Sequence, residues 1–205
     1  MIEIDELITG FPLLFPDHMD FLPWEMLSNL KLILEDMVLN LGEEYLVEDG
    51  IAIHQTAIVE LGAVIKRPAL IGKNCYICAN AYLREGVFLD QGVKIGPGCE
   101  IKNSMIFSET AVAHFNYIGN SMVGSQVNFE AGSIAANHYN ERRDKIISVR
   151  YKSDTISTGV EKFGSIIGDH TKIGANAVLS PGTILERSSV VKRLELVDQT
   201  GAILG

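Results

Sequence analysis

The chain has 205 residues, enough for one sizeable hydrophobic core or for one domain with a short extension. Hydrophobic residues make up 47% of it and charged residues 21%, which is the composition of an ordinary globular protein and not of a disordered one. The formal net charge of -9 argues against general nucleic-acid binding, which needs clustered Lys and Arg. An anionic ligand would therefore need a local basic site.

No run of eighteen apolar residues is present, and the first residues, MIEIDELITG, are acidic where a secretory signal would be basic. These features predict a cytoplasmic protein with no membrane partner. The cysteines Cys75, Cys78 and Cys99 include a C-x-x-C pair, but this pair lies among β-formers and lacks the further ligands of a structural zinc site. We expect small core thiols and no metal site.

Residues 1–48 form the first predicted unit. About the first twenty have prolines and aromatic residues without a clear period, which predicts an irregular extended arm packed on the body of the protein. A helix is predicted from about Pro23 to Gly42, because proline suits the first turn and apolar residues follow at a rough helical spacing. One helix is too small to be a domain, so we expect it to cap the end of the unit that follows.

From about Ile51 the sequence has a period of six residues. An apolar residue recurs at this spacing, and a small or aliphatic residue follows each of them four positions later. An α-helix cannot keep a six-residue register, and an ordinary strand would alternate every second residue. The apolar series is Ile53, Val59, Ile65, Ile71, Ile77, Leu83, Leu89, Ile95, Ile101, Phe107 and Ala113.

This period is what a triangular β-solenoid requires. Each hexapeptide makes one flat side, its apolar residue fills the interior, and three sides make a coil of eighteen residues. The pattern resembles that of the hexapeptide-repeat, left-handed parallel β-helix family. We therefore predict an all-β fold, with residues 49–205 as a left-handed parallel β-helix behind an N-terminal helical extension.

The repeat is interrupted in its second half. Residues 113–117 and 118–122 each supply five residues where six are expected, the pattern restarts at Val123-Gly124, and after Asn137 it stops until Ile167. Residues 138–164 are predicted to be an inserted loop or hairpin, because polar and apolar residues alternate around Ile146 to Tyr151.

Two features of the repeat point to chemistry. Stacked coils place Lys66, Arg84 and Lys102 in one column at the strand spacing of about 5 Å. Such a column either binds an anion such as a sugar phosphate or nucleotide sugar, or it extends into water and pairs with nearby Glu residues. His114 is assigned the same position after an inward residue, as either a general base near neutral pH or a corner histidine bonded to backbone.

A closer resemblance rests on Lys102-Asn-Ser, AHFNYIG at 113–119, VNFEAGSIAAN at 127–137 and IIGD at 166–169. With these motifs, the chain from about Ile51 to Val191 resembles the acetyltransferase domain of bacterial bifunctional N-acetylglucosamine-1-phosphate uridyltransferases and their sugar-nucleotidyltransferase-linked relatives. The resemblance implies acetyl transfer from acetyl-CoA to the 2-amino group of glucosamine 1-phosphate. It also implies a homotrimer with sites between subunits.

The resemblance assigns roles to individual residues. His114 matches the position of the catalytic base, and Asn137 lies near the acetyl group as a candidate to orient the amine or the thioester. The implied sugar-phosphate contacts are Arg84, Lys102, Tyr117 and Asn128, and the implied cofactor contacts are Lys162 and Ala175. Two departures matter, because Glu130 replaces a usual glycine and Arg193 lies one coil beyond Ala175, where a small residue is usual.

Three functions remain open from the sequence. The first is an acetyl-CoA-dependent N-acetyltransferase acting on an amino-sugar phosphate. The second is an acyltransferase acting on a nucleotide-linked amino sugar. The third is a non-catalytic solenoid that oligomerises with, or regulates, a separate sugar nucleotidyltransferase.

Overall fold

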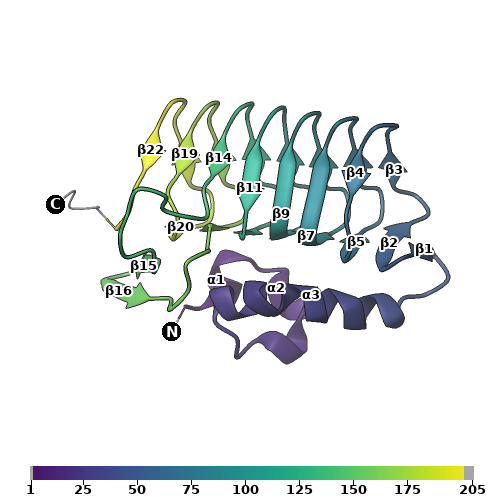
Figure 1. The fold of residues 1–205 in the computed structure, drawn as a ribbon, viewed down its shortest axis with the longest axis horizontal. Helices are drawn as coiled ribbons and strands as arrows, with labels where there is room; N and C mark the ends of the chain where they lie inside the picture. The colour runs from purple at the N-terminus through teal and green to yellow at the C-terminus, as the bar shows by residue number, and fades with distance from the viewer. Residues whose placement is uncertain (1, 201–205) are drawn as a thin grey trace.

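A parallel β-solenoid with three faces makes up most of the computed structural model, which describes residues 2–200 (Figure 1). Each coil contributes one short strand or strand segment to each face, and successive coils pair in parallel register. The predicted left-handed parallel β-helix is confirmed. The chain has the six-residue period because each coil must turn three corners and place an apolar side chain inside on every face.

The faces are named here by their strands. Face 1 contains β4 (Val64–Ile65), the first half of β7 (Tyr82–Leu89), the first half of β9 (Glu100–Ile106), β11 (Tyr117–Gly119), β14 (Ile134–Ala135), β19 (Val178–Leu179) and β22 (Leu196–Val197). Face 2 contains β2 (Ile51–His54), β5 (Ala69–Ile71), the second halves of β7 and β9, β12 (Met122–Val123), β17 (Ser165–Ile167) and β20 (Thr183–Leu185), with β1 (Tyr45–Glu48) antiparallel to β2. Face 3 contains β3 (Ile58–Val59), β6 (Tyr76–Ile77), β8 (Lys94–Ile95), β10 (Ala111–Val112), β13 (Asn128–Phe129), β18 (Lys172–Ile173) and β21 (Val190–Val191).

The interior of the solenoid is a stack of aliphatic side chains, most of them completely buried. Ile77, Leu83 and Leu89 supply the three faces of one coil, and Ile95 and Ile101 begin the next. The inward residue that follows is Ile106, five positions after Ile101, and the next is Val112. The prediction that Phe107 and Ala113 continue the inward series was therefore wrong, because the first shortened repeat comes two units earlier.

Phe107 instead belongs to a second core outside the solenoid. Face 2 presents outward apolar side chains, among them Phe88 and Met105, and the N-terminal segment covers them. Phe107 lies 6.2 Å from Phe11 and 6.0 Å from Phe88 between ring centroids. Burial of these rings holds the N-terminal segment on the solenoid.

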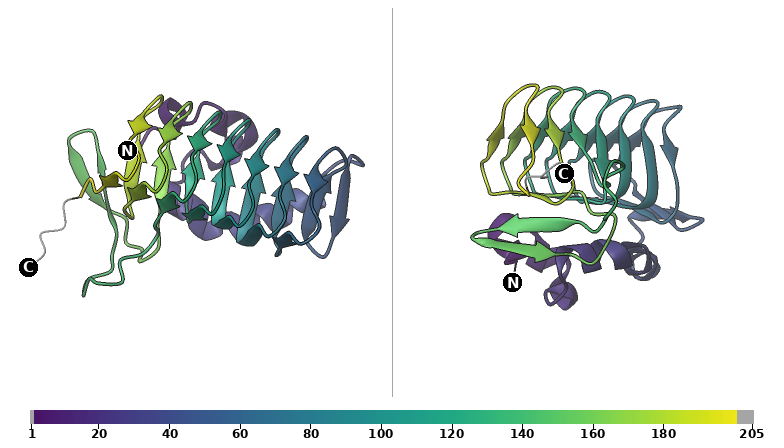
Figure 2. Two further views of the ribbon diagram at one scale, coloured as in Figure 1. Left: turned by 90° about the horizontal axis from the view of Figure 1, so that it is seen from above. Right: turned by 60° about the vertical axis from the view of Figure 1, so that its left-hand side comes forward.

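The N-terminal segment is helical and lies along the length of face 2 (Figures 1 and 2). It contains α1 (Ile4–Leu7), α2 (Phe11–Leu14), the 3-10 turn η1 (Pro16–His18) and α3 (Pro23–Leu39). Helix α3 contacts β5, β7 and β9 from successive coils. The prediction of an end cap was wrong, because the apolar stripe of face 2 runs along the solenoid and a helix must lie along it to cover it. Residues 4–18 likewise form short helical turns and not an extended arm.

Buried Asp169 fixes the N-terminal segment to the solenoid. Its Oδ2 accepts hydrogen bonds from Thr9 N (3.0 Å) and Thr9 Oγ1 (2.7 Å), and its Oδ1 accepts one from Ser125 N (2.8 Å). Leu7 O accepts the amide of Asp169 at 2.9 Å. The N-terminal segment is thus joined to two successive coils by a buried carboxylate whose two oxygens both accept hydrogen bonds.

The inserted segment between β14 and β17 contains an antiparallel hairpin, β15 (Ser148–Tyr151) with β16 (Asp154–Ser157). The hairpin lies beside the N-terminal helices at the C-terminal half of the solenoid (Figure 2). Lys152 forms an ion pair with Glu3 at 2.6 Å. The insertion therefore extends the outer core and leaves the coils on either side of it paired.

Replacing Phe107 by Ala tests the outer core. We expect Phe107→Ala to lower the free energy of unfolding by about 3–5 kcal/mol, because a completely buried ring leaves a cavity under the N-terminal segment. Urea unfolding measures the change. Leu32→Ala is the control. Leu32 lies on α3, which covers the same face of the solenoid, but its side chain is 67% exposed. Equal effects of the two changes would contradict this account of the helix packing.

Candidate active site

The corner between faces 1 and 2 carries a cluster of four charged side chains. Arg84 on β7 pairs in register with Lys102 on β9, as the column predicts. Arg84 donates through Nε to Glu100 Oε1 at 2.7 Å and forms a second ion pair, through Nη1, with Glu85 Oε1. Lys102 Nζ lies 3.5 Å from Glu85 Oε2. We call these four residues the charged corner.

Partial burial strengthens the ion pairs of the charged corner. Only 10% of the Lys102 side chain and 27% of the Arg84 side chain are exposed. Burial acts to lower the pKa of the Arg84 guanidinium, but the hydrogen bond to Glu100 and the charges of Glu100 and Glu85 together outweigh it, so that this pKa lies above its usual value. The Arg84 guanidinium is therefore held in place with its charge intact.

Tyr117 and Asn137 lie beside the charged corner on the following coils. Asn137 Nδ2 donates to Asn120 Oδ1 at 2.6 Å, and Asn137 is buried. Burial raises the pKa of the Tyr117 hydroxyl, and the nearby Glu100 carboxylate raises it further. Tyr117 is therefore a neutral hydroxyl that can donate to a ligand while Asn137 offers an amide.

A second group of the predicted residues lies at the corner between faces 3 and 1. The register places His114, Ala131, Ala175 and Arg193 in one column along this corner. His114 is exposed, and within the described chain no hydrogen bond to its ring is present. Its carbonyl accepts the amide of Gly132 at 2.9 Å. The prediction that His114 occupies the same position as Lys102 was wrong, because Val112 and not Ala113 points inward.

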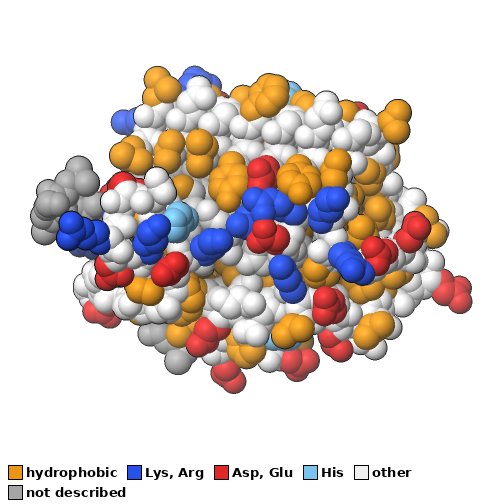
Figure 3. Space-filling model, viewed as in Figure 1, with side chains coloured by type: hydrophobic (Ala, Val, Ile, Leu, Met, Phe, Trp, Pro, Cys, Tyr) orange, Lys and Arg blue, Asp and Glu red, His pale blue; other side chains and the backbone are white. Residues whose placement is uncertain are grey.

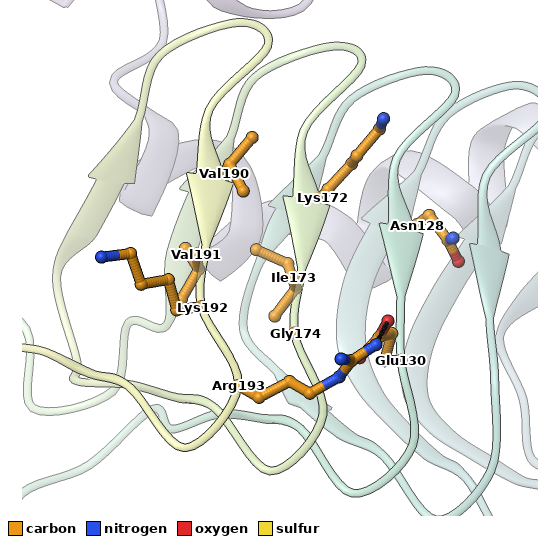
Figure 4. Close-up of a pocket in the computed structure, with 9 residues that line it drawn as sticks. All are labelled: Asn128, Glu130, Lys172, Ile173, Gly174, Val190, Val191, Lys192 and Arg193. Atoms are coloured by element: carbon orange, nitrogen blue, oxygen red, sulfur yellow. Dashed lines mark hydrogen bonds and ion pairs between the residues drawn. The ribbon is translucent and has the colours of Figure 1, made fainter.

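A groove of about 520 Å³ runs along face 3 next to this column. It is lined by Asn128, Glu130, Lys172, Ile173, Gly174, Val190, Val191, Lys192 and Arg193 (Figure 4). Lys172 and Lys192 carry positive charge at its sides, and Asn128 is exposed at its end. We call this hollow the face 3 groove.

An ion pair closes one side of the face 3 groove. Arg193 donates to both oxygens of Glu130, through Nε at 2.8 Å and Nη2 at 2.7 Å (Figure 4). Glu130 Oε2 also accepts the backbone amide of Ala175 at 2.9 Å. The pKa of Glu130 lies below its usual value because of the Arg193 hydrogen bonds, and the Ala175 amide adds to this effect. The two residues that depart from the resembled pattern therefore pair with each other across three coils.

The predicted site residues fall into two sets. Arg84, Lys102, Tyr117 and Asn137 lie together near the charged corner, whereas His114, Asn128 and Ala175 lie around the face 3 groove. Lys162 is exposed next to Phe163, whose amide donates to Asn137 O at 3.1 Å, so it belongs with the first set. Face 1 separates the two sets within one chain.

Face 1 has an apolar outer surface between these two corners. Its outward side chains include Val64, Tyr82, Ile134 and Leu196, which are 41%, 37%, 39% and 66% exposed. Figure 3 shows a row of hydrophobic side chains along this face, with Lys, Arg, Asp and Glu gathered beside it. A surface of this kind is typical of a protein interface.

Residues 2–200 contain no group of three His, Cys, Asp or Glu residues placed to hold a metal ion. Burial raises the pKa of the Cys75 thiol to about 12, and its Sγ donates to Asp90 O at 2.9 Å. No helix in the described part of the chain has both the length and the apolar character needed to cross a membrane.

Comparison with known proteins agrees with the fold. A family model described as the hexapeptide repeat of succinyl-transferase matches residues 68–103 and 165–192. The chain is therefore similar to hexapeptide-repeat proteins over these two segments. The two matched segments lie on either side of the shortened repeats and the insertion, which are the parts that depart most from the regular period.

Several curated proteins match part of the chain. The bifunctional protein GlmU of Methanococcus vannielii is 35% identical over 100 residues, covering 49% of this chain and 23% of that protein. A bifunctional sugar-1-phosphate nucleotidylyltransferase/acetyltransferase of Sulfurisphaera tokodaii is 35% identical over 83 residues, covering 40% and 20%. The GlmU of Buchnera aphidicola subsp. Schizaphis graminum is 38% identical over 92 residues, covering 44% and 16%. The chain thus spans less than a quarter of the length of these relatives.

The alternative that the basic column pairs with nearby Glu residues is confirmed for Glu85 and Glu100, which form half of the charged corner. Glu100 precedes the inward Ile101 and lies eighteen residues after Tyr82, so the coil period contains a signal for its position. Glu85 has no such signal, because it lies on an irregularity in the pairing between Arg84 and Val87.

Gly119→Ala tests the contact between Tyr117 and Asn137. A Cβ at Gly119 would lie 2.5 Å from Tyr117 Oη and 2.9 Å from Asn137 Cγ, so both side chains must move outward. We expect the Tyr117 hydroxyl to titrate at a lower pH in this variant, because its burial is the main cause of the raised pKa. NMR of ring-labelled tyrosine measures this, with Tyr117→Phe for assignment. Gly10→Ala is the control, since its nearest contact would be 3.4 Å; an unchanged Tyr117 titration in Gly119→Ala would contradict the packing.

Proposed function

We propose that this chain is an acetyl-CoA-dependent N-acetyltransferase acting on an amino-sugar phosphate, with glucosamine 1-phosphate as the first substrate to test. The observation that carries the proposal is the pair of half-sites on the two edges of an exposed apolar face. One half holds Arg84 and Lys102 beside Tyr117 and Asn137, and the other holds an exposed His114 beside a groove with two lysines. The names of the partial relatives, which include acetyltransferase and sugar-1-phosphate activities, support the same reaction.

Assembly of copies joins the two half-sites in this proposal. Face 1 of one chain packs next to its neighbours around an axis, so that the charged corner of one copy lies by the face 3 groove of the next. A contact between two different edges of the same protein is heterologous and closes as a ring, with the trimer as the smallest ring. Each complete site then takes phosphate-binding residues from one copy and the base from another.

The proposed reaction uses a small number of groups. An ammonium group is not a nucleophile, so the substrate reacts as its neutral amine, and His114 takes one proton from it as the amine attacks the thioester carbonyl of acetyl-CoA. The tetrahedral oxyanion needs N–H donors, which backbone amides and the Asn137 amide supply. Collapse breaks the C–S bond, and the CoA thiolate leaves and takes up the proton. The phosphate held by Arg84 and Lys102 keeps the amine in position.

The cofactor has two candidate contacts on this chain, Lys162 and Ala175. Lys162 is exposed near Asn137 and offers an ammonium group to a phosphate of CoA. The amide of Ala175 is already bonded to Glu130, so a pantetheine arm along this column either displaces that carboxylate or passes outside the Glu130–Arg193 pair.

The Glu130–Arg193 pair favours a second candidate function. The ion pair narrows the groove next to His114, where a cofactor would have to lie. A narrowed groove would suit a solenoid that has lost acyl transfer and that oligomerises with or regulates a separate sugar nucleotidyltransferase. Transfer to a nucleotide-linked amino sugar is the other enzymatic alternative, since the face 3 groove is long and basic along its sides. Free-thiol release from acetyl-CoA separates these functions when glucosamine 1-phosphate and nucleotide-linked amino sugars are each supplied.

His114→Asn tests the proposed base. We expect kcat to fall by about two to four orders of magnitude, because the variant keeps a polar side chain but cannot accept the proton. The assay follows thiol release with glucosamine 1-phosphate. His170→Asn is the matched control, since His170 is another exposed histidine at a solenoid corner and Asn suits its φ of 63°. Equal activity of native protein and His114→Asn would remove His114 from the mechanism.

Ile134→Glu tests the assembly. We expect this change to convert the native trimer to a monomer at micromolar concentration, because a charge would be buried in the centre of the face 1 contact. Analytical ultracentrifugation measures the mass. Leu32→Glu introduces the same charge on α3, which covers face 2, at a side chain that is 67% exposed, and should leave the trimer intact. A monomeric native chain would contradict the shared site.

A further inference from the structure

Glu85 occupies the place between Arg84 and Lys102 that a bound anion would take. One carboxylate oxygen forms the ion pair with Arg84 Nη1, and the other lies 3.5 Å from Lys102 Nζ. A phosphate that uses both cations needs the same two directions. The carboxylate therefore competes with any anion for this pair of donors.

The backbone at Glu85 shows that this residue departs from the pattern of its corner. Its φ is 62°, in the left-handed region that side chains other than Asn and Gly seldom adopt. At the same corner of the next two coils the residues are Asn103 and Asn120, with φ of 44° and 46°. Glu85 with Gly86, whose φ is 99°, makes a bulge opposite a single residue, Asn103. Bulges of this kind re-aim a side chain, and here the side chain points to the two cations.

The charge balance of the corner also indicates that a carboxylate competes with a bound anion. Arg84 and Lys102 carry two positive charges, and Glu85 and Glu100 carry two negative charges. A phosphomonoester brings nearly two more negative charges at neutral pH, so the corner binds it well only if a carboxylate leaves. Glu85 is the carboxylate more open to exchange, because 43% of its side chain is exposed against 34% for Glu100, and because Glu100 Oε1 contacts both Nε and Nη2 of Arg84 at 2.7 Å.

We propose that Glu85 is a specificity-determining residue of this site, an internal carboxylate that a phosphate ester must displace from Arg84 and Lys102 in order to bind. Glu85 thereby weakens the binding of free phosphate and of simple phosphate esters. A full substrate overcomes this competition through its sugar contacts to Tyr117 and Asn137. The inference rests on the proposed function for the identity of the substrate, but the exchange of anions does not depend on acetyl transfer.

The test compares anion binding by the native full chain and by Glu85→Gln. Calorimetric titration with glucose 1-phosphate, which lacks the amine, should give a dissociation constant about five- to tenfold lower for Glu85→Gln, the change expected when a competing charge-assisted hydrogen bond is removed. Titration with glucosamine, which lacks the phosphate, should give the same value for both proteins. Glu109→Gln is the matched control, because Glu109 is also a left-handed corner residue, with φ of 58°, and should bind like the native chain.

Glu85→Asn is a second variant, and it is expected to fold because Asn occupies the equivalent positions of the next two coils. Glucose 1-phosphate should also bind more tightly to this variant. Unchanged or weaker binding by both Glu85 variants, or no binding by any of the proteins, would overturn the proposal. Thiol release with glucosamine 1-phosphate is measured separately. Tighter anion binding without any acetyl transfer would leave the role of Glu85 intact and would contradict only the proposed function.

Discussion

The stacked aliphatic rows inside the solenoid determine where every outward side chain lies. Completely buried residues such as Ile77, Leu83 and Ile101 cannot change places with their polar neighbours without placing a polar group in the core. Each residue that follows an inward position is thus set on a fixed corner, one strand spacing from its equivalent in the next coil. The alignment of Arg84 with Lys102 is a direct consequence, since Leu83 and Ile101 pair in the same register.

The same constraint explains which parts of the fold follow from the sequence. A period of six is a property of local spacing, so the solenoid, the column of cations and the insertion can be read from residue order alone. The position of the first shortened repeat cannot, because Ile106 and Phe107 are adjacent and both apolar. Only the N-terminal helical segment decides between them, since Phe107 packs on Phe11 and Phe88 and leaves Ile106 to point inward. The location of α3 depends on the same tertiary contact.

This one-residue difference changes the position of His114 within its corner. With Ala113 inward, His114 would directly follow an inward residue, as Lys102 follows Ile101; with Val112 inward, it lies two positions after the inward residue. The offset of twelve residues from Lys102 to His114 amounts to two faces of a coil, and the structure places the two residues at opposite edges of face 1. Sequence offsets along one chain carry no information on contacts between copies, so they do not show whether a second copy brings the two sets together.

At both edges of face 1, the basic side chains near the candidate site are paired with carboxylates of the same chain. Glu85 and Glu100 balance Arg84 and Lys102 at one edge, and Glu130 balances Arg193 at the other. A chain with an overall charge of -9 repels anionic substrates at long range, and screening at physiological salt limits that repulsion to about 8 Å. Binding must then come from short-range exchange of a protein carboxylate for a ligand phosphate. Such exchange favours ligands that add sugar contacts to the phosphate over free phosphate, so that selectivity arises from the carboxylates as much as from the cations they pair with.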